Sequence, residues 1–123
     1  MPQFRHLVDN VDDAVAFYRD RLGFELLQQF GPAMARLCRD DLELWVAGPM
    51  ASASQPMPDG TKPGPGGWNR IVIMVNGIEA EVDRLRDNGV TFRSDLVAGP
   101  GGKQILCVDS SGNHVEFFEP ADR

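Results

Sequence analysis

Arg70 stands at the head of a strongly apolar segment, the run WNRIVIMV at residues 68–75. A guanidinium in such a place is either solvated at the edge of a strand or directed at a negative group inside the fold. Because arginine stays protonated and offers no lone pair, the second reading requires a carboxylate or an anionic ligand as its partner. Its chemistry would be the binding of that carboxylate or the stabilisation of negative charge in a reaction.

Two histidines are the other groups that titrate near neutral pH. His114 and Glu116 are two residues apart in one expected strand, so both side chains are expected on the same face. His114 is therefore a candidate general base. The alternative is a residue at the rim of a site or in an interface. His6 is three residues from Gln3 in the same expected strand, so its side chain should point to the other face. We expect it to pack behind its sheet in a structural role.

The segment GPGGKQ at residues 99–104 is rich in glycine but lacks the spacing of a nucleotide-binding loop. Its glycines either let the backbone approach a ligand, with Lys103 meeting an anionic group there, or form a hairpin loop. Trp45 and Trp68 are candidates for the wall of a pocket, and a place in the core is the alternative for both.

The elements that must position these residues occur twice. A shift of 67 positions lays Val8–Asp12 on Val75–Glu79, and after one residue is dropped, residues 22–24 meet residues 88–90. The copies are weak in identity and consistent in pattern. Such internal similarity predicts a fold built from two like modules.

Each copy predicts the order β-α-β-β-β from its hydrophobic spacing and its turn residues. In the first copy we expect a helix that is capped by Asn10 or Asp12 and ends at Gly23. In the second copy the helix runs through Ile78, Val82 and Leu85 and ends at Gly89. The expected strands are 3–8, 24–29, 33–39 and 42–47, then 70–75, 90–94, 104–108 and 114–119.

The expected organisation is one α+β domain over residues 1–123, with module 1 at about 1–47 and module 2 at about 68–120. Residues 48–67 are dense in Gly, Pro and Ser, and we expect a loop or linker without packed structure. Neither half is large enough to close a core comfortably alone. We therefore expect two tandem βαβββ modules with pseudo-twofold symmetry, whose sheets curl around a central cavity.

Two stretches carry a resemblance to a known family: VDNVDDAVAFYRDRLGFELL at residues 8–27 and DSSGNHVEFFEP at residues 109–120. They resemble the first helix and the closing motif of the vicinal oxygen chelate superfamily. That superfamily includes glyoxalases, extradiol dioxygenases and bleomycin resistance proteins. The resemblance covers nearly the whole chain, and Ser110 replaces the usual proline of the closing motif, which should leave the turn intact.

The resemblance implies a cup of two modules with a metal held by the first and last strands of each. Counting five residues back from Val8 and Val75 gives Gln3 and Arg70, and the last-strand positions fall on Glu43 and Glu116. Strand alternation supports the set, because the neighbours on the same faces are aromatic, apolar and polar, as in a ligand pocket. These neighbours include Trp45, Met74, Phe118 and His114.

Metal binding is placed in doubt by Arg70. Gln3, Glu43 and Glu116 suit a divalent ion, but arginine cannot ligate one. Since two carboxylates in a partly dry cup need a cation, we interpret Arg70 as an internal substitute for the ion. Three uses stay open: a structural ion pair with Glu116 or Glu43, an anchor for a substrate carboxylate or enolate, and metal binding by the other three residues with Arg70 aside.

Two functions follow as hypotheses. The first is a glyoxalase- or dioxygenase-like enzyme, of lyase, isomerase or dioxygenase type, acting on a small oxygenated metabolite. Glu116 or Glu43 would move a proton to an enolate-like intermediate, stabilised by a metal or by Arg70. The second is a non-catalytic protein that binds and sequesters a small molecule of antibiotic type, and the acidic balance is compatible with a cationic ligand. The resemblance also implies a homodimer.

Bulk properties exclude other classes. The net charge of −6 argues against nucleic acid and against an anionic membrane surface as partners. No apolar run approaches the roughly 20 residues of a membrane span, and no signal pattern opens the chain, so we expect a cytoplasmic protein. The two cysteines form no metal-binding or disulfide motif, and we expect both to be small buried side chains.

Overall fold

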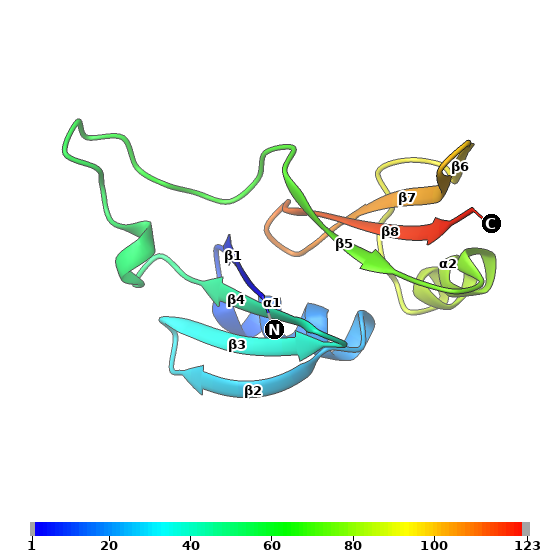
Figure 1. The fold of residues 1–123 in the computed structure, drawn as a ribbon. Coiled ribbons are helices and arrows are strands. Elements are labelled where there is room, and N and C mark those ends of the chain that lie inside the picture. The colour runs from blue at the N-terminus through cyan, green and yellow to red at the C-terminus, as the bar shows by residue number, and fades with distance from the viewer. Residues whose placement is uncertain (1, 122–123) are drawn as a thin grey trace. The chain divides into compact units, whose positions relative to one another are not determined.

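The computed structural model describes residues 2–121 and contains two four-stranded mixed sheets. The first copy of the repeat forms β1 (Gln3–Leu7), α1 (Val11–Ala16), η1 (Phe17–Arg21), β2 (Glu25–Phe30), β3 (Met34–Arg39) and β4 (Leu42–Ala47). The second forms β5 (Arg70–Met74), α2 (Ile78–Asp87), β6 (Val97–Gly99), β7 (Gly102–Val108) and β8 (His114–Pro120). The predicted pair of βαβββ modules is confirmed (Figure 1).

The two sheets have the same topology. Their strand orders are β1-β4-β3-β2 and β5-β8-β7-β6. In each sheet the first and last strands of the module run parallel, and the remaining pairs are antiparallel. The chain separates into two compact units, one containing the chain up to Gly67 plus the turn Asp109–Asn113, the other containing the rest.

The first helix begins at the predicted cap and ends irregularly. Asn10 accepts a hydrogen bond from the Asp13 backbone N–H at 2.9 Å, as an N-cap does. The helix then widens into the π-helical turn η1, in which the Leu22 N–H reaches back five residues to the Phe17 carbonyl at 3.3 Å. A π-turn accommodates one extra residue, which explains the residue dropped in aligning the two copies.

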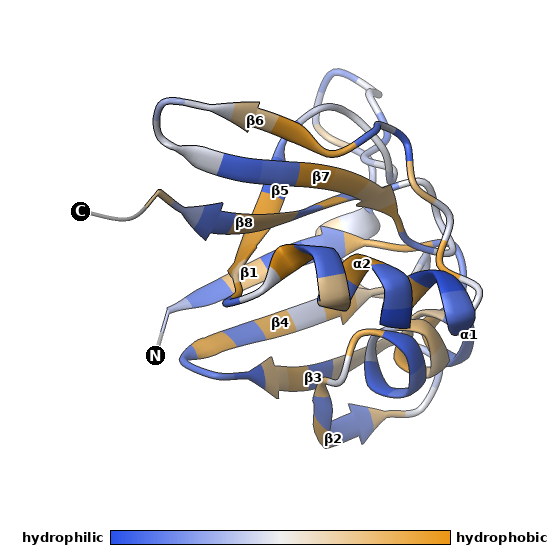
Figure 2. Cartoon of the chain, turned by 90° about the vertical axis from the view of Figure 1, so that its right-hand side faces the viewer, coloured by the Kyte–Doolittle hydropathy of each residue, from blue (hydrophilic) through white to orange (hydrophobic). Residues whose placement is uncertain are grey.

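The first sheet has one face covered by α1 and one face that α1 leaves open. Leu37, Leu44 and Val46 are fully buried on the helix side, and α1 packs against β3 and β4. Figure 2 shows the alternation as hydrophobic and hydrophilic bands along β4. We call the other side, with Arg5 and Trp45, the open face of the first sheet.

The second unit repeats this arrangement. The buried side of α2 is lined by Ile78, Val82 and Leu85. The helix begins directly after Gly77, and Gly77 itself has the left-handed backbone conformation. Ile71 and Ile73 on β5 are buried, whereas Arg70, Val72 and Met74 alternate with them and are exposed. We call this exposed side the open face of the second sheet.

Two local predictions are wrong. Residues 90–94 form no strand and make only an isolated bridge between Phe92 and Cys107, while β6 lies further on and pairs with β7 as a hairpin. Within the expected linker 48–67, Gly48, Ala51 and Ser54 are buried: η2 (Ser52–Ser54) follows β4, and the Ser54 hydroxyl donates to the Gly48 carbonyl at 2.7 Å. The expectation of a stretch without packed structure is therefore wrong for this first part, because small residues can be buried without large apolar side chains, while residues 56–67 contain no helix or strand.

The closing motif forms a tight turn within the first unit. One Asp109 carboxylate oxygen accepts from the backbone N–H groups of Ser111 and Asn113, at 2.8 and 2.9 Å. The Asn113 amide then donates to the Leu7 carbonyl at 2.8 Å. The turn is formed with serine in place of the proline of related motifs.

In the described part of the chain, no helix has the length and apolar character needed to cross a membrane.

Candidate functional site

Strand alternation brings the predicted residues of the first unit onto the open face of its sheet. Gln3 and Glu43 are partners in the parallel pair β1–β4, and Arg5 and Trp45 are the next partners on the same face. Arg36 on β3 is the antiparallel partner of Trp45. The face thus carries two guanidiniums, a carboxylate, an amide and an indole.

Glu43 is held by two donors on this face. Arg36 donates from Nε to Glu43 Oε2 at 2.8 Å, and Trp45 donates from Nε1 to the same oxygen at 2.6 Å. The bond from Arg36, followed by the bond from Trp45, lowers the pKa of Glu43 from its ordinary value. Gln28 accepts a further hydrogen bond from Arg36 Nη1 at 3.2 Å. Glu43 is therefore an ionised carboxylate whose charge is already compensated.

In the second unit Arg70 pairs with Glu116. Their closest atoms, Nη1 and Oε1, are 3.7 Å apart, which makes an ion pair without a direct hydrogen bond. The Arg70 side chain keeps 34% of its surface exposed, against 13% for Glu116. Met74 and Phe118 are partners further along the same strand pair. The guanidinium donors thus remain accessible on the open face of the second sheet.

His114 is buried beside Trp68 at the start of β8. The two rings are stacked, with centroids 4.7 Å apart and planes 15° apart, and His114 is 3% exposed. Arg93 lies with its guanidinium 4.7 Å from the Trp68 ring centre and its Nη1 3.4 Å from His114 Nε2. Since a guanidinium can only donate, His114 Nε2 is the acceptor. Trp68 itself is 63% exposed, so its predicted alternative of a core position is wrong.

The strand register corrects the equivalence of the two acidic residues. Gln3 faces Glu43 in β1–β4, but Arg70 faces His114 in β5–β8, and Glu116 faces Val72 two residues further on. The position that corresponds to Glu43 in the second sheet is therefore that of His114. The resemblance to the family had implied Glu116 as the counterpart of Glu43, but the hydrogen bonding between the strands sets the register.

Lys103 and His6 lie away from the open faces. Lys103 is in β7, not in a loop, and its Nζ pairs with Glu79 of α2 at 2.6 Å, on the side opposite Glu116. We therefore remove Lys103 from the candidate site. His6 lies behind its sheet as predicted, where its Nδ1 contacts the Tyr18 hydroxyl at 3.2 Å.

The His6 contact is part of a buried polar chain. The Tyr18 hydroxyl donates to Asp109 Oδ2 at 2.8 Å, so the hydroxyl proton is used and His6 Nδ1 must donate to the hydroxyl oxygen. Burial lowers the pKa of His6, and the nearby Asp109 charge partly opposes that effect. His6 is thus a neutral structural residue.

Arg5, Arg36 and Arg93 were not predicted as site residues from the sequence. A signal existed for Arg36, because the turn at Asp40 and Asp41 fixes the β3–β4 pairing, in which Cys38 faces Glu43 and Arg36 is the next residue on that face. Arg93 follows an isolated bridge outside the regular strands. Its position beside His114 had no such periodic signal.

Over residues 2–121, neither unit by itself offers a ligand set for a divalent metal ion. Within each unit, the described residues contain no group of three His, Cys, Asp or Glu side chains that could hold a metal. Glu43 already has a guanidinium and an indole N–H on one oxygen, and Arg70 places a positive charge beside Glu116. A second cation at either carboxylate would meet a fixed positive charge.

Comparison with known proteins places this geometry in context. Residues 1–117 match the family model described as the Glyoxalase/Bleomycin resistance protein/Dioxygenase superfamily. No curated protein sequence matches the chain.

Several solved structures are similar in fold. A lactoylglutathione lyase from Agrobacterium tumefaciens is 19% identical with a TM-score of 0.79, over 97% of this chain and 92% of that one. TnmS3, an antibiotic binding protein from Streptomyces sp. CB03234, is 23% identical with a TM-score of 0.76, over 97% and 93%. A superfamily member from Sphaerobacter thermophilus is 25% identical with a TM-score of 0.75, over 95% and 94%.

Proposed function

Because the chain belongs to the glyoxalase/bleomycin resistance protein/dioxygenase superfamily, we propose that it binds a small molecule on the open face of one of its sheets without a resident metal ion. The observation that carries this proposal is the pairing of Glu43 with donors of its own sheet. Its Oε2 accepts from both Arg36 and Trp45, so one of its two carboxylate oxygens is already engaged. A metal that took this oxygen would leave the Arg36 guanidinium without its charge partner.

The state of His114 supports binding rather than catalysis. A general base must present a free lone pair to the proton that it removes. In His114 the Nε2 lone pair faces Arg93, and the ring is covered by Trp68. Similarity in fold to an antibiotic binding protein is in keeping with a binding role.

An enzyme is the second candidate, and Arg70 is the residue that favours it. Its guanidinium is about one-third exposed and is only loosely paired with Glu116, so it has donors to offer to an enolate or carboxylate. In that case Arg70 would stabilise negative charge and Glu116 would move the proton. Similarity in fold to a lactoylglutathione lyase is in keeping with this alternative.

Metal retention tests the proposal directly. The purified protein is loaded separately with Ni²⁺, Zn²⁺, Mn²⁺ and Fe²⁺, dialysed, and analysed for metal per chain. We expect far less than one ion per chain. Stoichiometric metal that is lost in Glu43→Gln, and kept in the exposed control Glu25→Gln on the same sheet, would overturn the metal-free proposal.

A second experiment separates binding from catalysis. Compounds that raise the melting temperature are incubated with the protein for long periods and then recovered. We expect them back unchanged. Conversion of a bound compound, abolished by Arg70→Gln, would establish the enzyme instead.

A further inference from the structure

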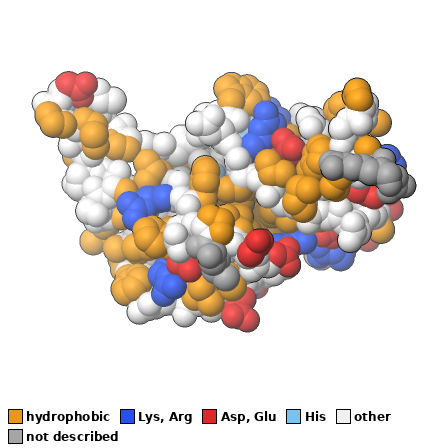
Figure 3. Space-filling view, viewed as in Figure 1, with side chains coloured by type: hydrophobic (Ala, Val, Ile, Leu, Met, Phe, Trp, Pro, Cys, Tyr) orange, Lys and Arg blue, Asp and Glu red, His pale blue; other side chains and the backbone are white. Residues whose placement is uncertain are grey.

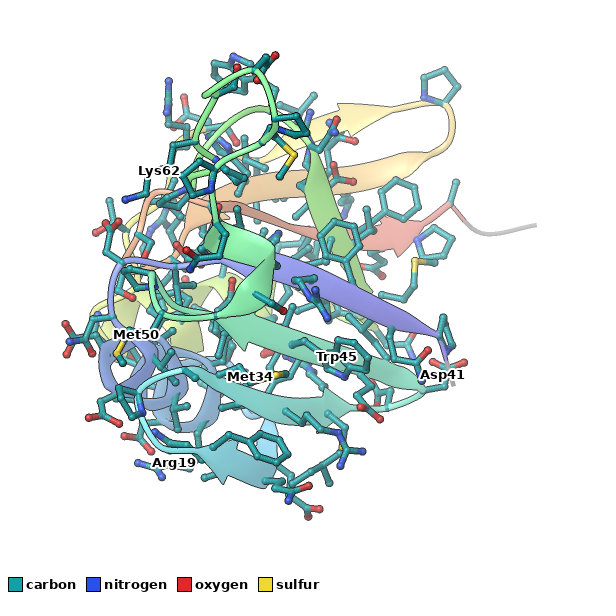
Figure 4. The ribbon with its side chains drawn as sticks, turned by 90° about the vertical axis from the view of Figure 1, so that its left-hand side faces the viewer. Arg19, Met34, Asp41, Trp45, Met50 and Lys62 are labelled. Carbon is teal, nitrogen blue, oxygen red and sulfur yellow. The ribbon has the colours of Figure 1, made fainter. Side chains whose placement is uncertain are left out.

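The first unit contains a pocket of about 300 Å³ that none of the predicted site residues explains. It lies at the end of the open face where β4 leads into η2. Four sheet residues and two from the following segment form most of its lining: Arg5, Phe30, Met34, Ala47, Met50 and Ser52. Figure 4 looks onto this part of the unit and labels Met34, Trp45 and Met50.

The segment after β4, which contributes part of the lining, is held in place by hydrogen bonds. The Gly48 N–H donates to the Ala33 carbonyl at 2.8 Å, and the Ala51 and Ser54 N–H groups continue the turn with bonds of 3.0 Å each. Ala51 and Ser54 are 9% and 5% exposed, so the segment is anchored through these two small residues. The pocket is thus a built feature of the fold.

The pocket combines an apolar lining with one positive charge. Phe30 and Met50 are 46% and 71% exposed, which is unusual for such large apolar side chains. Hydrophobic side chains are exposed over the segment after β4, with Met50 and Met57 among them (Figure 3). The lining contains no Asp or Glu.

Arg5 supplies the charge and has no acidic partner in the described part of the chain. Its guanidinium lies 5.0 Å from the centre of the Trp45 ring, a cation–π contact that orients the group while leaving its N–H donors available. Arg36, the other guanidinium on this face, is bound to Glu43. Arg5 is therefore the donor that a ligand in the pocket would meet.

We propose that this pocket binds an amphipathic monoanion, with an apolar ring in the space between Phe30, Met34 and Met50 and a carboxylate on Arg5. The inference rests on the proposed binding function and names its ligand class. It reverses the expectation of a cationic ligand, which came from the net charge of the whole chain, because recognition depends on the local charge. Ala47 in the lining of the pocket is four residues along β4 from Glu43, or about 13 Å away.

The size of the pocket limits the ligand. Small-molecule sites commonly measure about 300–1,000 Å³, and this pocket is at the lower end of that range. A bicyclic aromatic carboxylate is a suitable probe. A bond between a guanidinium and a carboxylate is charge-assisted and directional, so the anion should be clearly preferred over a neutral compound of the same shape.

Three probes of one shape test the charge preference: 2-naphthoate, 2-naphthamide and 2-naphthylmethylammonium. Affinity is measured by titration calorimetry on the full chain. Occupancy is located from the ¹³C-methyl NMR signals of the methionines. We expect 2-naphthoate to bind at least about tenfold more tightly than the amide. We also expect it to shift the methyl signals of Met34 and Met50 while that of Met57 stays in place.

Variants test the role of Arg5. Arg5→Gln should weaken 2-naphthoate binding about tenfold or more and leave the amide unaffected, whereas Arg5→Lys should retain part of the preference. Arg19→Gln is the matched control, since it removes one positive charge from the same unit outside the pocket. The affinity of this variant for 2-naphthoate should equal that of the wild type. Far-UV circular dichroism and urea midpoints verify that each variant is folded.

The inference is overturned if no probe binds, if 2-naphthoate and 2-naphthamide bind equally, if Arg5→Gln has no effect, or if Met34 and Met50 do not respond. Metal retention bears on the proposed function alone. Stoichiometric metal would overturn the metal-free proposal whatever 2-naphthoate does, and equal binding of the probes would overturn the ligand class while leaving the metal-free proposal intact.

Discussion

Arg36 donates a hydrogen bond from Nε to Glu43 Oε2 over 2.8 Å, from one strand of the first sheet to the next. From the sequence we expected one internal cation in the site and assigned that role to Arg70. The structure has one arginine for each of the two carboxylates, Arg36 for Glu43 and Arg70 for Glu116. Charge compensation is thus completed separately in each unit.

The Arg36–Glu43 pair should make stability depend on pH in the acid range. The pKa of Glu43 is lowered by folding, so the pair stabilises the folded state above the unfolded value near 4.5, and this contribution is lost as pH falls through the folded pKa. Urea midpoints of wild type and Glu43→Gln should therefore differ at pH 7 and converge in acid. A difference that does not change with pH would contradict the ionised pair, and Glu25→Gln is the control.

His6 should titrate below the free value of 6.5, because burial disfavours its charged form. NMR titration of the imidazole signals measures the midpoint. Since the Asp109 charge raises the pKa, Asp109→Asn should move the midpoint lower still. The folded state binds fewer protons than the unfolded chain below pH 6.5, so this group lowers stability as pH falls from 6.5 to the folded value. A wild-type midpoint above 6.5 would refute the neutral assignment.

Tyr18→Phe should destabilise the protein by about 1–3 kcal/mol. The substitution removes the hydroxyl that donates to the buried Asp109 carboxylate, while the aromatic ring stays in place. Tyr18 has no exposed surface, and its hydroxyl is 2.8 Å from Asp109 Oδ2. Urea denaturation gives the free energy of unfolding. Asp20→Asn, in an exposed pair with Arg19, is the control and should leave the midpoint unchanged. Equal stability of Tyr18→Phe and wild type would show that the bond contributes nothing.

Gly48→Ala should cost about 1–3 kcal/mol through crowding. A methyl group at this position would lie 2.9 Å from the Pro32 carbonyl oxygen and 2.9 Å from a Val11 methyl carbon. Gly64→Ala is the matched control, since nothing lies within 4 Å of a methyl group there. Its free energy of unfolding should stay within about 0.5 kcal/mol of the wild type. A tolerated Gly48→Ala would mean that the segment after β4 is loosely held.

The sequence predicts the fold well in strands whose side chains alternate every two residues and whose pairing with the neighbouring strand is regular. The strands around Gln3, Glu43, Arg70 and Glu116 were identified within a residue or two, and the residues sharing each open face followed from parity. The cap at Asn10 and the ends at Gly23 and Gly89 were also recognisable, because helix termini need particular side chains or backbone angles.

Three features required the three-dimensional structure. Periodicity cannot fix the register between β5 and β8, so the relation of Arg70 to His114 was hidden. The segment 90–94 has a strand-like composition but only one bridge, since pairing depends on a partner and not on propensity. The packing of Ser54 depends on backbone groups, which hydropathy does not record.

The turn at Asp109–Asn113 belongs to the second copy of the repeat but folds with the first unit, where Tyr18 and Leu7 bind it. The boundary between the two compact units therefore does not coincide with the boundary of the duplication. A fragment that stops at Gly67 would lack the acceptor for the Tyr18 hydroxyl, so it should be less stable than the same segment in the full chain. Any circular permutation or split reporter built on this chain would have to keep residues 109–113 covalently or noncovalently available to the N-terminal segment.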